Sequence, residues 1–208
     1  MGIFDFFTGG NDSRVFLWDG KNPTTPKQFG YAVVKSAIDN TSGDVGEMFG
    51  SRTSKVQQRI YQKAQGAQLA LIALQAAVIY VYALKVLAVP KDILAELFAG
   101  MTKGFENLLG NSDGTTSGTA FAVLLEKLLR LYSKSLFDEL TNASPNENPI
   151  SLGPTAELVI QTIAELCEVK EDLASNPLEH IQLMQIAARN GILLLIGFAN
   201  KNCITYRP

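Results

Sequence analysis

The sequence predicts an all-α protein, a bundle of roughly six to eight helices around a long, largely apolar central helix at about residues 51–89. Apolar residues recur at three- and four-residue spacing along most of the chain, which is the period of an amphipathic helix. Sustained alternation of polar and apolar residues between hairpin turns is missing, so strands are not predicted. A third observation is the stretch Ala64–Leu84, which carries no charged residue.

The composition is that of a folded protein with a low surface charge. The chain has 208 residues, of which 47% are hydrophobic and 18% are charged. Because soluble domains average about 25% charged residues, part of the surface is expected to be covered by a partner, a second copy or a membrane. The net charge of −2 gives no reason to expect a nucleic-acid ligand.

The first 25 residues read as an N-terminal arm in front of a single helical domain at 26–208. The arm is rich in large aromatic side chains, which usually dock against other surfaces. These side chains either dock on the bundle itself or bind a neighbouring protein, and they are Phe4, Phe6, Phe7, Phe16 and Trp18. The arm lacks the basic start and long apolar run of a secretory signal, so a cytoplasmic location is expected, with membrane association as the alternative.

Capping residues and prolines place the individual helices. Thr25 can cap a helix that begins at Pro26 and is expected to end near residue 39, before a turn at 40–43. Asn176 is expected to cap the last helix in the same way. The periodic segments between them predict helices at about 51–89, 90–109, 119–140, 154–169 and 176–200. The polar, proline-containing segment 142–154 is a candidate hinge or domain boundary, and the pair Gly100 and Gly104 marks either close packing or no specific contact.

The central helix carries a seam of small residues that lets another helix approach closely: Gly66, Ala70, Ala73 and Ala77. Its uncharged stretch is also long enough to cross a bilayer, which takes about 20 apolar residues. Three glutamines interrupt that stretch, and each would need a polar partner in hydrocarbon. We therefore expect a helix enclosed by other helices, and keep a membrane span as the alternative.

Basic residues gather at the start of the central helix as a stripe of Arg52, Lys55, Arg59 and Lys63. Four cations on a chain of net negative charge are a weak indication of nucleic-acid binding. The stripe is expected either to face solvent or to pair with the acidic segment Glu157–Glu179.

Candidate catalytic and metal-binding groups are few. His180 is the only histidine. His180 and Met184 lie on one helix, so they cannot be the axial ligands on opposite faces of one haem. Cys167 and Cys203 lack zinc-binding spacing and are expected to be buried free thiols, with a single disulfide between them as the alternative. The acidic cluster lacks the Glu-x-x-His pairs of a di-metal bundle and is expected to be a solvated helix end; it comprises Glu165, Glu168, Glu171 and Asp172. The sequence thus predicts neither a cofactor nor a metal.

These observations predict a non-enzymatic structural or adaptor subunit that acts through protein–protein contacts, either in a homo-oligomer or with other proteins. The main alternative is a membrane-spanning or membrane-inserting protein that uses residues 64–84. An enzyme based on the acidic cluster is a third hypothesis.

Overall fold

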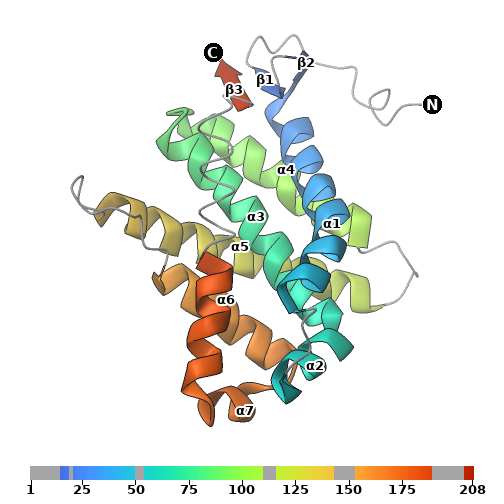
Figure 1. Ribbon diagram of the computed structural model, residues 1–208. Coiled ribbons are helices and arrows are strands. Elements are labelled where there is room, and N and C mark those ends of the chain that lie inside the picture. The colour runs from blue at the N-terminus through green and yellow to red at the C-terminus, as the bar shows by residue number, and fades with distance from the viewer. Residues whose placement is uncertain (1–14, 19–20, 50–53, 110–115, 143–152, 189–203) are drawn as a thin grey trace.

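The computed structural model describes residues 15–18, 21–49, 54–109, 116–142, 153–188 and 204–208 (Figure 1). Within these ranges the chain is mostly helical, as the sequence predicts. The helices are α1 (Pro26–Phe49), α2 (Lys55–Gln62), α3 (Ala64–Lys85), α4 (Lys91–Leu109), α5 (Thr116–Asn142), α6 (Gly153–Leu166) and α7 (Lys170–Ala174), and a further helical segment covers 177–188.

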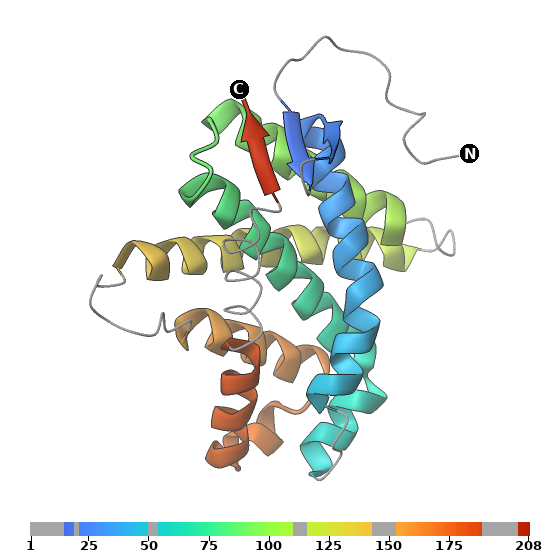
Figure 2. The ribbon, with the colours of Figure 1, turned by 45° about the horizontal axis from the view of Figure 1, so that its top comes forward.

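A small antiparallel sheet joins two distant parts of the chain at one end of the bundle (Figure 2). Its strands are β1 (Val15–Trp18), β2 (Lys21–Thr24) and β3 (Ile204–Arg207), in the order β2-β1-β3. The sequence does not predict this sheet, because strands of four residues are too short to show a period-two pattern.

Phe16 of β1 packs into the core of its own bundle. It is fully buried, and its ring stacks on that of Phe29 with the centroids 4.6 Å apart. Tyr206 of β3 lies against the same ring at 5.2 Å. Of the two alternatives for the aromatic arm, Phe16 therefore follows the first, and its buried ring is not exposed to a partner.

Helix α1 begins as predicted but is longer than predicted. The Thr25 hydroxyl accepts a hydrogen bond from the Gln28 amide at 3.3 Å, and the Gln28 side chain accepts one from the Thr25 amide at 3.1 Å. This reciprocal pair is a capping box. The predicted turn at 40–43 is wrong, because the helix continues to Phe49. Thr41 is buried there and donates its hydroxyl to the Ala37 carbonyl, so tertiary packing overrides the local turn preference.

Two glycines allow α1 and α4 to touch backbone to backbone. A Cβ atom on Gly30 would lie 2.3 Å from the Leu97 carbonyl oxygen, and one on Gly100 would lie 2.1 Å from the Lys27 carbonyl oxygen. One turn further along α4, a Cβ on Gly104 would meet Val34 at 3.0 Å. Close packing, the first of the two alternatives for Gly100 and Gly104, is confirmed.

The long central helix is divided at Lys63 into a polar α2 and an apolar α3. Lys63 leaves helical geometry with ψ of 38°, and its carbonyl accepts a hydrogen bond from the Gly66 amide at 3.0 Å. The end of α6 packs on this junction, where a Cβ on Gly66 would lie 2.8 Å from the Leu166 Cβ. Beyond it, Ala70, Ala73 and Ala77 are fully buried.

Helix α3 is the hub of the bundle and contacts α1, α2, α4, α5 and α6 (Figure 1). It is long and apolar enough to cross a membrane by length and composition. Inside the bundle, however, 78% of its most apolar window is buried. Such burial is what the core helix of a helical bundle requires.

Candidate functional site

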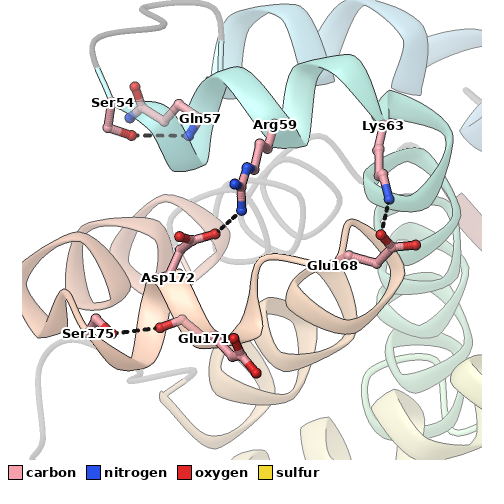
Figure 3. Close-up of polar contacts among 8 residues, drawn as sticks. All are labelled: Ser54, Gln57, Arg59, Lys63, Glu168, Glu171, Asp172 and Ser175. Carbon is pink, nitrogen blue, oxygen red and sulfur yellow. Dashed lines mark hydrogen bonds and ion pairs between the residues drawn. The ribbon is translucent and has the colours of Figure 1, made fainter.

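Two cations of the basic stripe, Arg59 and Lys63, point toward acidic residues that follow α6 (Figure 3). Arg59 forms an ion pair with Asp172, and Lys63 forms one with Glu168. The hydrogen bond from Lys63 lowers the pKa of the Glu168 carboxyl. For these two cations, pairing with the acidic segment is thus confirmed. Lys55 is exposed on α2, whereas Arg52 lies outside the described residues.

His180 and Cys167, the other candidates for chemistry in the sequence, also make structural contacts. The Nε2 atom of His180 lies 2.8 Å from a carboxylate oxygen of Glu157, and this hydrogen bond lowers the pKa of Glu157. The Cys167 thiol is buried and donates to the Lys63 carbonyl at 3.5 Å. Burial raises the pKa of this thiol to about 11. Across the part of the chain that the structure describes, no three His, Cys, Asp or Glu side chains are grouped to hold a metal.

An open groove between α3, α4 and α5 is the strongest candidate for a binding site. Its volume is about 650 Å³, within the range of about 300–1,000 Å³ typical of ligand sites. Aromatic and basic side chains line it together with small and aliphatic ones: Tyr80 and Leu84 of α3, Ala95 and Phe98 of α4, and Arg130, Ser133, Lys134 and Phe137 of α5.

Aromatic rings and cations are in direct contact in this groove. The rings of Tyr80 and Phe98 meet edge to face with centroids 5.8 Å apart. The Arg130 guanidinium lies 4.3 Å from the centre of the Phe98 ring. At the other end, the Lys85 ammonium lies 3.9 Å from the centre of the Phe137 ring. Each cation–π contact fixes both a charged group and an apolar surface.

The groove has unused capacity for a polar and negatively charged ligand. Arg130 donates two hydrogen bonds to Glu126, at 2.8 and 3.2 Å, and three of its five N–H donors remain. Lys134 has no ion-pair partner among the described residues, and the buried Ser133 hydroxyl has no hydrogen-bond partner among them. Burial raises the pKa of Tyr80, against the opposing charge of Arg130, so its hydroxyl stays protonated at neutral pH.

The spacing along α5 explains how the wall is built. Residues 130, 134 and 137 follow at four and three positions and therefore share one face. Leu129, Tyr132 and Leu136 are buried on the inner face, which fixes the rotation of the helix.

The sequence does not predict this groove. One signal for it is present in Phe137, an aromatic residue that follows the charged positions 130 and 134 on the outer face of the helix. Of the aromatic arm, Phe4, Phe6 and Phe7 lie outside the described residues, and Trp18 is described only as part of β1.

No protein-family model, no curated protein and no solved structure matches this chain.

Proposed function

We propose that this chain is a non-enzymatic helical structural or adaptor subunit that acts through protein–protein contacts in a larger assembly. We further propose that the groove between α3, α4 and α5 is its docking site. The supporting observation is the combination of aromatic rings and cations in one groove. Aromatic residues and arginine are the types most enriched at the energetic centres of protein interfaces.

The chemistry of the groove suits an acidic segment that carries aromatic side chains. Ring edges and faces on Tyr80, Phe98 and Phe137 offer apolar area to rings of the partner. Arg130 and Lys134 attract its carboxylates. The open shape suits a peptide that lies along the groove and enters from solvent.

A binding experiment with a labelled synthetic peptide tests this proposal. The probe is a short peptide in which Asp and Phe alternate with Ser and Gly, and two controls replace either all Phe by Ser or all Asp by Lys. The full chain should bind the probe at least about tenfold more tightly than either control, which is about 1.4 kcal/mol. Equal affinity for all three peptides would contradict the proposal.

Two lysines on α5 provide a matched pair of variants for the same experiment. Lys134 lines the groove and Lys127 does not, although both are exposed and lie seven residues apart on one face. Lys134→Glu should weaken binding of the probe about tenfold, whereas Lys127→Glu should change it less than about threefold, because screening acts over about 10 Å. Equal effects of both variants would place the peptide elsewhere.

The length and hydropathy of α3 favour a second candidate function, membrane insertion. Insertion would require the bundle to open, because α3 is enclosed by other helices. Leakage of dye from anionic vesicles and retention in the membrane pellet after carbonate extraction test this candidate. Neither leakage nor retention is expected of a subunit that keeps α3 in its core.

A further inference from the structure

We infer that the groove binds the N-terminal segment of a second copy of this chain, residues 3–7. This inference rests on the proposed function and names the partner. The segment reads Ile3, Phe4, Asp5, Phe6 and Phe7. It thus brings together three aromatic rings, one aliphatic side chain and one carboxylate, which is the chemistry that the groove fits.

Charge and composition match on the two sides. The groove presents three rings and the cations Arg130 and Lys134, and a third cation, Lys85, lies over one of the rings. The segment presents three rings with Asp5 between them. Its carboxylate can pair with Lys134, which has no ion-pair partner among the described residues, while its rings extend the aromatic contacts of Phe98 and Phe137.

The segment is joined through residues 8–14 to β1 of the sheet. Phe16 anchors β1 at one end of the bundle, whereas α5, which carries the cations, crosses its middle (Figure 2). Eight residue steps join Phe7 to Val15, and they can span up to about 26 Å at about 3.3 Å per residue. A segment that starts from the end of one molecule can therefore reach the side of a neighbour.

Such a contact is heterologous, because the segment of one copy meets the groove of another. It leaves one free groove and one free segment on each pair, so assembly continues until a ring closes or an open chain forms. The low charged fraction of 18% agrees with a surface that is covered in such an assembly.

A charge exchange in the full chain tests the inference by sedimentation velocity. Asp5→Lys places a cation opposite Lys134, and Lys134→Glu places an anion opposite Asp5. The wild-type mass should rise above 22.6 kDa with increasing concentration, whereas each single variant should remain a monomer over a concentration range at least about tenfold higher.

Assembly should return when the two single variants are mixed. The cationic segment of the Asp5→Lys chain then meets the anionic groove of the Lys134→Glu chain, and the unchanged Asp5 of the latter meets the unchanged Lys134 of the former. The chain that carries both Asp5→Lys and Lys134→Glu should assemble alone for the same reason. Lys127→Glu should assemble like the wild type, and far-ultraviolet circular dichroism should show equal helix content in all variants.

Three results would overturn the inference: a wild-type chain that stays monomeric, single variants that assemble like the wild type, or a mixture that stays monomeric. The first and third would also result if the segment bound the groove of its own chain. Binding of the synthetic Asp–Phe peptide to the wild-type groove tests the docking function separately from the identity of the partner. If that peptide binds while the exchange fails, the docking function stands and the second copy is not the partner.

Discussion

At the scale of single residues, the side chains that could act as nucleophiles, bases or charged ligand contacts are mostly held in structural contacts. The Cys167 thiol is buried against the Lys63 carbonyl, and His180 is paired with Glu157. Arg59 and Lys63 join α2 to the acidic residues after α6. The exception is Lys134, which carries a charge into the groove with no ion-pair partner among the described residues.

Cys167 should be unreactive in the folded protein. Burial raises the pKa of its thiol to about 11, so only ~0.1% is thiolate at pH 8, and the thiolate is the nucleophile. A Cys203→Ser chain, which retains only Cys167, should not react with Ellman's reagent at pH 8 until guanidinium unfolds it. Full reaction within seconds under native conditions would show that the thiol is accessible.

Sequence reasoning succeeds at this scale where the signal is local. The caps of Thr25 and Asn176 are predicted and confirmed, because a cap needs only residues three positions apart. The partner of His180 is not predictable in this way. Glu157 lies 23 positions away, and only the packing of α6 against the segment 177–188 brings the two side chains together.

At the scale of elements, contacts between helices decide where each helix begins, ends and touches its neighbours. Glycines let α1 and α4 meet at backbone distance, and the end of α6 lies on the break between α2 and α3. The helix-forming segments are predicted from apolar periodicity. The continuation of α1 past residue 40 and the break at Lys63 are not, because both depend on packing against distant residues.

Alanine at two glycines of α4 should have very different effects. Gly100→Ala brings a Cβ within 2.1 Å of the Lys27 carbonyl oxygen, and the helices must separate, which should cost about 3 kcal/mol of unfolding free energy. In Gly104→Ala the new Cβ meets the Val34 Cβ at 3.0 Å, which is a milder clash. The higher helix propensity of alanine, about 1 kcal/mol, offsets the cost of that clash, so the free energy of unfolding should change little. Urea denaturation compares the two, and equal losses would contradict the packing described for α1 and α4.

A glycine in the loop between α3 and α4 should stabilise the folded protein. Ala88 is exposed and has a φ of 50°, a left-handed conformation that costs a residue with a Cβ about 1–2 kcal/mol. Ala88→Gly should therefore raise the free energy of unfolding by about 0.5–1 kcal/mol. Ala99→Gly, at an exposed helical position in α4, should lower it by about 1 kcal/mol. Changes of the same sign would show that Ala88 is not strained.

At the scale of the whole molecule, the bundle around α3 creates a groove that no single segment encodes. Its walls come from three helices, and its aromatic and basic groups lie up to 57 positions apart, from Tyr80 to Phe137. Apolar periodicity predicts the bundle because it indicates which face of each helix is buried. The same periodicity assigns Phe98 to the core and Arg130 and Lys134 to the solvent face, so it does not show that they meet.

The most direct test of the docking site is a charge exchange between the groove and the synthetic peptide. Affinities are measured for four combinations, wild type and Lys134→Glu with the Asp–Phe and the Lys–Phe peptide. If the carboxylates of the peptide lie against Lys134, the Lys–Phe peptide binds Lys134→Glu more tightly than the wild type, with a coupling free energy of about 1–2 kcal/mol. Additive effects, with a coupling near zero, would contradict docking in this groove.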